Sequence, residues 1–139
     1  TGGYVEGGSN SNVIDYITMA STGNATDFGD MLSAKYYSAG ASSTTRGLMA
    51  GGNSNQNVIQ YITIASTGNA TDFGDLTVSK NGRAGVCSKS RAVFGGGDSD
   101  TNVMDYVEIA TTGNASDFGD LTVARSYLSG TSSNHGGLS

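Results

Sequence analysis

A ten-residue segment recurs three times along this chain and is the strongest constraint on its fold. The segment reads STGNATDFGD at residues 21–30 and again at 66–75, and TTGNASDFGD at residues 111–120. The aromatic and aliphatic positions on each side keep the same spacing of 45 residues, as shown by Phe28, Phe73 and Phe118, and by Tyr16, Tyr61 and Tyr106. Because this spacing accounts for nearly the whole chain, we interpret residues 1–139 as one repeat domain with three repeats.

Each repeat divides into four short predicted strands. In the middle repeat, residues 57–65 are rich in β-branched and aromatic side chains, and turn residues separate them from residues 71–78, 83–87 and 91–95. Gly74 is expected to mark a bulge or a tight bend. The pattern predicts an all-β fold of β-propeller blades, each with four antiparallel strands and one 45-residue repeat. An open β-solenoid fibre, with the same unit stacked along an axis, is the alternative.

The composition excludes several classes of partner. With 22 Gly, no Pro and 36% hydrophobic residues, the chain is typical of a turn-rich all-β protein. A net charge of −5 and only seven Lys and Arg argue against nucleic acid as a partner. No apolar run is long enough for membrane insertion. Cys87 is the single cysteine, so an intrachain disulfide is impossible, and we predict that it is a small buried side chain.

The recurring segment contains Asp27-Phe28-Gly29, the tripeptide that holds magnesium in protein kinases. A kinase needs this aspartate once, together with a glycine-rich loop, a strand lysine and a catalytic Asp and Asn, whereas here it occurs three times without them. We therefore predict a structural role, in which each Asp caps its own turn, Phe fills the space between blades and Gly supplies backbone freedom.

Two further motifs are better explained as turns. Asn24, Asn69 and Asn114 begin N-glycosylation sequons, but an Asn that follows Gly is typical of a turn. Asp98 and Asp100 begin a sequence like a calcium loop, yet Val103 and Ile109 stand where that loop needs Gly and Glu. A turn is the preferred interpretation there, and a weak cation site stays an open alternative.

Catalytic constellations are missing from the sequence. His135 is the single histidine, and no Glu recurs with the repeat, so neither a catalytic triad nor a zinc or copper site can be assembled from this pattern. We predict no catalytic residue, no metal and no cofactor, and hence that the chain is not an enzyme.

The repeat resembles the kelch repeat. The second repeat supplies the glycine pair Gly51-Gly52, then Tyr61, Phe73 and Lys80, and the third supplies Gly96-Gly97, Tyr106, Phe118 and Arg125. The first repeat has Glu6-Gly7 in place of the glycine pair, and Phe stands where kelch repeats usually have Trp. The stretch from Gly113 to Gly130 is also similar to repeats in tail-fibre and virion appendage proteins of marine bacteriophages.

These resemblances imply a β-propeller on a virion or another extracellular assembly. Propellers use four to eight blades, so three repeats form an incomplete ring. The expected partners are further repeats of the same chain or a second copy in a homo-oligomer.

Positions that differ between the repeats are the candidates for function. Residues 36–38, 81–83 and 126–128 vary, as do residues 8–12, 53–57 and 98–102. Because antiparallel strands alternate in direction, these loops should share one face, opposite to the GNATDF turns. The predicted ligand-binding residues on that face are Tyr36, Tyr37, Arg83, Asp98, Asp100 and Tyr127.

Flat aromatic and polar groups suit contact with protein or with cell-surface carbohydrate. The predicted function is therefore a non-catalytic structural or adhesive binding module. The alternative is that the chain is part of a propeller enzyme, a glycosidase or an oxidase, whose catalytic blades lie elsewhere.

Overall fold

The protein is all-β, as the sequence predicts. The structure, a computed structural model, describes residues 3–4, 9–53, 56–99 and 101–132. These residues form strands and turns and contain no helix, and every strand pair is antiparallel.

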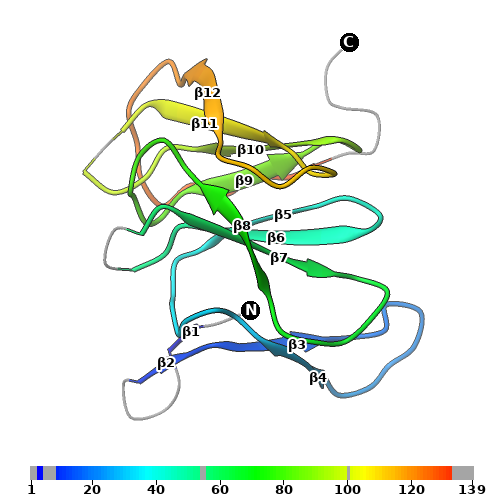
Figure 1. Ribbon diagram of the computed structural model, residues 1–139. Helices are drawn as coiled ribbons and strands as arrows, with labels where there is room; N and C mark the ends of the chain where they lie inside the picture. Colours follow the sequence, from blue (N-terminus) through cyan, green and yellow to red (C-terminus); the bar gives the residue numbers. More distant parts are fainter. Residues whose placement is uncertain (1–2, 5–8, 54–55, 100, 133–139) are drawn as a thin grey trace.

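In the described residues, three sheets and one separate short strand pair follow one another along the chain, and the three sheets lie one above another (Figure 1). Sheet 1 pairs β3 (Val13–Tyr16) with β4 (Thr26–Asp30), next to the short pair β1 (Gly3–Tyr4) and β2 (Asn10–Ser11). Sheet 2 contains β5 (Ala39–Ser42), β6 (Arg46–Ala50), β7 (Val58–Thr63) and β8 (Thr71–Asp75). Sheet 3 contains β9 (Ala84–Cys87), β10 (Arg91–Gly95), β11 (Val103–Glu108) and β12 (Ser116–Asp120). In sheets 2 and 3 each strand pairs with its neighbour in sequence.

The four strands predicted for one repeat do not form one sheet. Residues 57–65 and 71–78 contain β7 and β8 of sheet 2, whereas residues 83–87 and 91–95 contain β9 and β10 of sheet 3. The loop after Gly51-Gly52 joins two strands that pair with each other, and the connection after β8 crosses to the next sheet. The sheets are therefore offset from the predicted unit by half a repeat.

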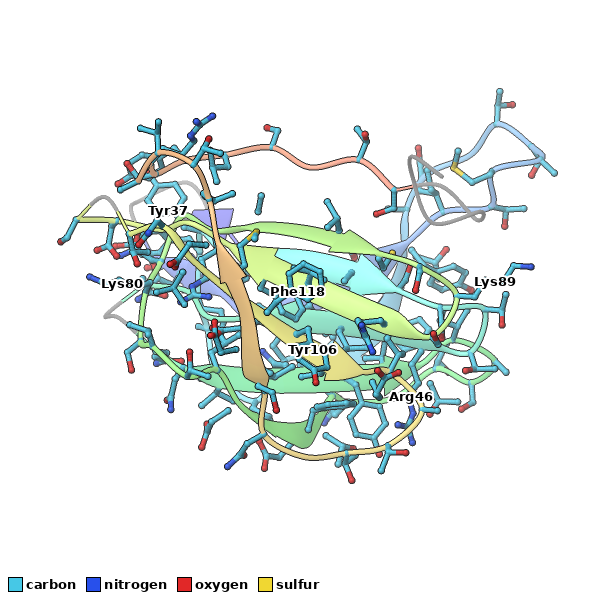
Figure 2. All side chains as sticks on the ribbon, turned by 90° about the horizontal axis from the view of Figure 1, so that it is seen from above. Tyr37, Arg46, Lys80, Lys89, Tyr106 and Phe118 are labelled. Carbon is cyan, nitrogen blue, oxygen red and sulfur yellow. The ribbon has the colours of Figure 1, made fainter. Side chains whose placement is uncertain are left out.

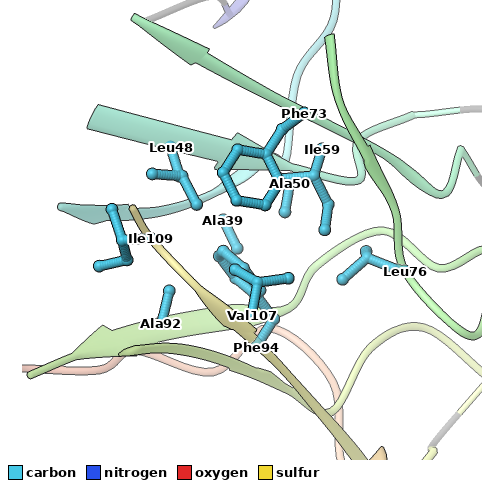
Figure 3. Packing of buried hydrophobic residues seen from close by; sticks show 10 residues of the cluster. All are labelled: Ala39, Leu48, Ala50, Ile59, Phe73, Leu76, Ala92, Phe94, Val107 and Ile109. Carbon is cyan, nitrogen blue, oxygen red and sulfur yellow. The ribbon is translucent and has the colours of Figure 1, made fainter. Parts of the chain in front are cut away.

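The hydrophobic core lies between successive sheets. Ten buried residues fill the space between sheets 2 and 3 (Figure 3), namely Ala39, Leu48, Ala50, Ile59, Phe73, Leu76, Ala92, Phe94, Val107 and Ile109. A smaller cluster of Ile14, Phe28, Met31, Met49 and Ala70 fills the space between sheets 1 and 2. Burial of each large side chain stabilises the fold by about 1.5–3 kcal/mol. The sheets are thus held together mainly by apolar faces.

The recurring segment makes the same local structure in each repeat. The ring centroids of Tyr61 and Phe73 are 5.9 Å apart and nearly perpendicular, and the two equivalent pairs are both 6.0 Å apart. The pairing of β7 with β8 shifts by one residue at Phe73, which places a bulge before Gly74. Gly74 has φ 143°, a conformation that strongly favours glycine. Its predicted role as a bulge or bend is confirmed.

Glycines bring the first strands of sheets 2 and 3 into backbone contact. Gly40, Gly85 and Gly130 occupy the equivalent position in successive repeats. A Cβ atom on Gly85 would lie 2.2 Å from the Gly40 carbonyl oxygen, and one on Gly130 would lie 2.8 Å from that of Gly85. Any side chain at Gly85 would therefore force the strands apart. We call these three residues the glycine column.

Candidate functional site

The variable loops gather at one end of the sheets. Tyr37, Gly82 and Tyr127 are equivalent positions in the three repeats, and all have a left-handed backbone, with φ of 59°, 66° and 55°. The Gly82 N–H donates to the Tyr37 carbonyl oxygen over 3.2 Å, and the Tyr127 N–H donates to that of Gly82 over 2.9 Å. In Figure 2, Tyr37 and Lys80 lie at one end of the sheets and Lys89 at the other. The hydrogen bonds therefore join three loops distant in sequence into one surface.

Three tyrosines form this surface, which we call the tyrosine surface: Tyr36, Tyr37 and Tyr127. The Tyr37 ring lies 4.8 Å from the Tyr36 ring and 5.5 Å from the Tyr127 ring, edge to face in both cases. Tyr37 is 51% exposed and Tyr127 is 65% exposed. The two rings meet across Gly82, where a Cβ atom would lie 3.2 Å from the Tyr127 ring. Sequence reasoning predicted the tyrosines and missed Gly82, which makes room for their contact.

Two of the three tyrosines, Tyr37 and Tyr127, have a backbone conformation that is costly for a residue with a Cβ atom. A left-handed conformation costs roughly 1–2 kcal/mol for an ordinary L-residue. Such conformations concentrate at functional sites, where the surrounding structure imposes them. Tyr37 and Tyr127 adopt one while half or more of each side chain is exposed to solvent. Exposed aromatic rings on a strained and hydrogen-bonded backbone are the main reason to consider this a binding site.

Asp98 lies near this surface and holds a neighbouring loop. Its carboxylate accepts from the backbone N–H and the side-chain amide of Asn81, over 3.2 and 3.1 Å. Asn53, the equivalent of Asp98, accepts from the Tyr36 N–H over 3.1 Å. Asp98 therefore has a structural role in loop geometry. Asp100 lies outside the described residues.

Arg83 lies inside the protein and not on the predicted surface. Its side chain is buried, and the Nη1 atom forms an ion pair of 2.7 Å with Asp105, which is fully buried. The guanidinium also donates to the carbonyl oxygens of Val78 and Phe94 over 3.2 and 3.4 Å, and the Thr77 hydroxyl donates to Asp105. The prediction of an exposed loop cation is wrong because the buried carboxylate attracts the side chain inward. The sequence offered one signal, since Arg83 and Asp105 replace Ser38 and Gln60 of the preceding repeat.

The equivalent positions one repeat earlier hold buried polar side chains but no ion pair among the described residues. Lys35 and Gln60 are buried, and within the described part of the chain no hydrogen-bond partner is found for Lys35 Nζ, Gln60 Nε2 or Ser38 Oγ. Burial lowers the pKa of the Lys35 ammonium below its ordinary value of 10.5, because the charged form loses its hydration. Gln60 Oε1 accepts from the Leu32 N–H over 2.8 Å. Successive repeats therefore hold different polar groups in the same space.

At the opposite end, Cys87 lies between two surface clefts of about 270 and 380 Å³. The polar cleft is lined by Ser42, Ser43, Thr44, Cys87, Ser88, Lys89 and Ser132. Cys87 Sγ accepts from the Ser42 N–H over 3.5 Å, and the Cys87 N–H donates to Ser132 Oγ over 2.8 Å. Cys87 is partly buried and packs against the core between sheets 2 and 3, so the prediction of a buried side chain is met only in part.

The described residues at the two ends of the sheets do not include the groups of a metal site. Among the described residues, no cluster of three or more His, Cys, Asp and Glu could hold a metal ion. The same part of the chain contains no helix that could cross a membrane. No protein family model matches this chain. No curated protein matches it either.

Proposed function

We propose that this chain is a segment of a kelch-like β-propeller that serves as a non-catalytic structural or adhesive module on a virion appendage or another extracellular assembly. The tyrosine surface is its ligand-binding face. The observation that carries the proposal is the contact of Tyr37 and Tyr127 across Gly82, with both rings exposed and both backbones left-handed. The resemblance of the repeat to repeats of phage appendage proteins favours a virion appendage over another extracellular assembly as the location of the chain.

The stacking of the sheets supports a propeller. Sheets 2 and 3 are four-stranded meanders, and their first strands, β5 and β9, meet through the glycine column. First strands that converge in this way are expected around a propeller axis. Single-particle imaging tests this proposal, with a disc as the expected particle and a rod as the contrary result.

Carbohydrate is the ligand class that this surface suits best. Exposed tyrosine rings offer flat apolar faces for sugar C–H groups and hydroxyls for hydrogen bonds. The net charge of −5 disfavours polyanionic ligands.

A glycan array followed by calorimetry on the best ligand tests the binding function. We expect Tyr37→Ala and Tyr127→Ala each to weaken binding by about tenfold, since an aromatic contact contributes on the order of 1 kcal/mol. Met19→Ala is the control, because Met19 is 89% exposed and lies in the turn between β3 and β4. Equal affinity in all three variants would rule out the tyrosine surface, and binding to a protein but to no glycan would change the ligand class.

A further inference from the structure

The recurring segment joins successive repeats through three hydrogen bonds. The Gly68 and Ala70 N–H groups donate to the carbonyl oxygens of Phe28 and Asp30, both over 2.7 Å. The side-chain Oδ1 of Asn69 accepts from the Asp30 N–H over 3.0 Å. The GNA turn of one repeat thus binds the FGD segment of the preceding repeat. We call this set of contacts the inter-repeat clamp.

The clamp recurs between the second and third repeats with the same dimensions. Gly113 and Ala115 donate to Phe73 and Asp75 over 2.8 and 2.7 Å, and Asn114 Oδ1 accepts from the Asp75 N–H over 3.0 Å. Both contacts are tight, because a Cβ atom on Gly29 or Gly74 would lie 2.4 Å from the carbonyl oxygen of the facing turn. Two matching copies define how any two repeats of this sequence dock.

The third repeat presents an unused acceptor half of this clamp. Phe118 is 48% exposed, whereas its equivalents Phe28 and Phe73 are 8% and 3% exposed. No described residue lies within 4 Å of the position of a Cβ atom on Gly119. In the view from above, Phe118 lies beside Tyr106 on sheet 3, the uppermost sheet of Figure 1 (Figure 2). Within the described residues, this end of the stack therefore offers an aromatic ring and an unpaired strand edge.

The first repeat presents the matching donor half. Gly23, Asn24 and Ala25 make no hydrogen bond with any described residue. Ala25 is exposed, whereas its equivalent Ala70 is buried in the cluster that contains Phe28. The two ends of the stack are thus complementary to each other.

We propose that the turn at residues 23–25 of a second copy of this chain docks on β12, head to tail, through the inter-repeat clamp. Gly23 and Ala25 of that copy would donate to the carbonyl oxygens of Phe118 and Asp120, and Asn24 Oδ1 would accept from the Asp120 N–H. A contact between two different surfaces gives a ring if the rotation closes and a filament if it does not. The proposal is independent of the tyrosine surface, so either can fail without the other.

Sedimentation equilibrium over a wide concentration range tests the contact. We expect the mass to rise above the 14.0 kDa of one chain. Ala25→Asp should weaken association by at least about a hundredfold, because it places a charge where the equivalent alanines are enclosed. Thr22→Asp is the matched control, since its equivalents Thr67 and Thr112 stay exposed at the two internal clamps.

Asn24→Ala separates the clamp from general surface effects. It removes one acceptor and should weaken association by about tenfold without lowering the stability of the monomer. Asn69→Ala and Asn114→Ala remove the same acceptor inside the chain and should lower stability instead.

Mixing two defective variants tests the head-to-tail direction. Chains with Ala25→Asp and chains with Phe118→Asp should each fail to associate alone and should form a one-to-one complex when mixed, because one intact contact remains. A mass of 14.0 kDa at every concentration up to about a millimolar would overturn the proposal. Association that Ala25→Asp leaves unchanged, or a mixture without complex, would also overturn it.

Discussion

Buried polar side chains are the residues at which the three repeats differ most inside the fold. Arg83, directly before β9, and Asp105, on β11, form a buried ion pair, whereas Ser38 and Gln60 occupy the equivalent positions one repeat earlier. A buried ion pair adds little net stability when compared with a neutral replacement, but loss of one partner leaves an uncompensated charge. The two repeats therefore hold two different pairs of polar residues at equivalent positions. We expect one pair to replace the other only when both residues are changed together.

We expect Asp105→Gln to lower the free energy of unfolding by about 3–5 kcal/mol, because it leaves the Arg83 guanidinium without its carboxylate. The double variant Arg83→Ser with Asp105→Gln copies the preceding repeat and should be more stable than the single variant. Urea unfolding measures both. Glu108→Gln is the control, since the exposed Arg91–Glu108 pair should contribute less than about 1 kcal/mol. A loss no larger than that of the control would contradict the interpretation.

Lys35 predicts a dependence of stability on pH. Burial lowers its pKa in the folded protein, so the unfolded chain holds the proton more tightly and unfolding becomes easier as the pH falls below 10.5. Lys35→Met should raise the free energy of unfolding by about 1–3 kcal/mol at neutral pH.

The advantage of Lys35→Met should shrink as the pH rises through 10.5, because above that value lysine becomes neutral in both states. Urea unfolding of the variant and the unmodified protein at a series of pH values checks this. Lys80→Met, at the half-exposed equivalent position, should give a smaller gain. An advantage that does not change with pH would be inconsistent with the burial of a charge.

Among the structural elements, the strands were the most predictable from sequence. The runs of β-branched residues and the turn residues located β7, β8, β9 and β10 to within a few residues. Their grouping into sheets was not predictable, because both kinds of connection between strands have similar lengths and compositions. The sequence also located Tyr36, Tyr37 and Tyr127, since they lie where the repeats differ.

Two features of the site could not be read from the sequence. The inward turn of Arg83 depends on Asp105, which lies on a strand 22 residues further along the chain. The clamp depends on contacts between residues 39 positions apart, such as Asp30 and Asn69. Local turn chemistry explained Asn69 without that contact, so nothing in the pattern required a partner in the next repeat.

The clamp predicts different costs for equivalent glycine substitutions. Gly74 and Gly119 have φ of 143° and 129°, so alanine is strained at both. Only at Gly74 would the Cβ atom meet a backbone, the Gly113 carbonyl oxygen at 2.4 Å. Gly74→Ala should therefore be less stable than Gly119→Ala by about 1–3 kcal/mol in thermal or urea unfolding of the monomer. Equal losses would mean that strain alone determines the cost.

At the scale of the whole molecule, head-to-tail docking links stability to concentration. A partner that binds only the folded state raises the unfolding midpoint by mass action. We expect the midpoint of the unmodified protein to rise over about a hundredfold increase in concentration, and that of Ala25→Asp to stay constant. Differential scanning fluorimetry at matched concentrations measures both. A midpoint that rises equally in the two proteins would indicate association through another surface.

The glycine column has a consequence for how such a chain can diverge. Because the backbones of Gly40 and Gly85 meet directly, and Gly130 lies close to the Gly85 carbonyl oxygen, main-chain atoms set the spacing from one repeat to the next. After a repeat is duplicated, the loops at the two ends of the sheets can therefore change in sequence while the new repeat keeps the same position relative to its neighbours.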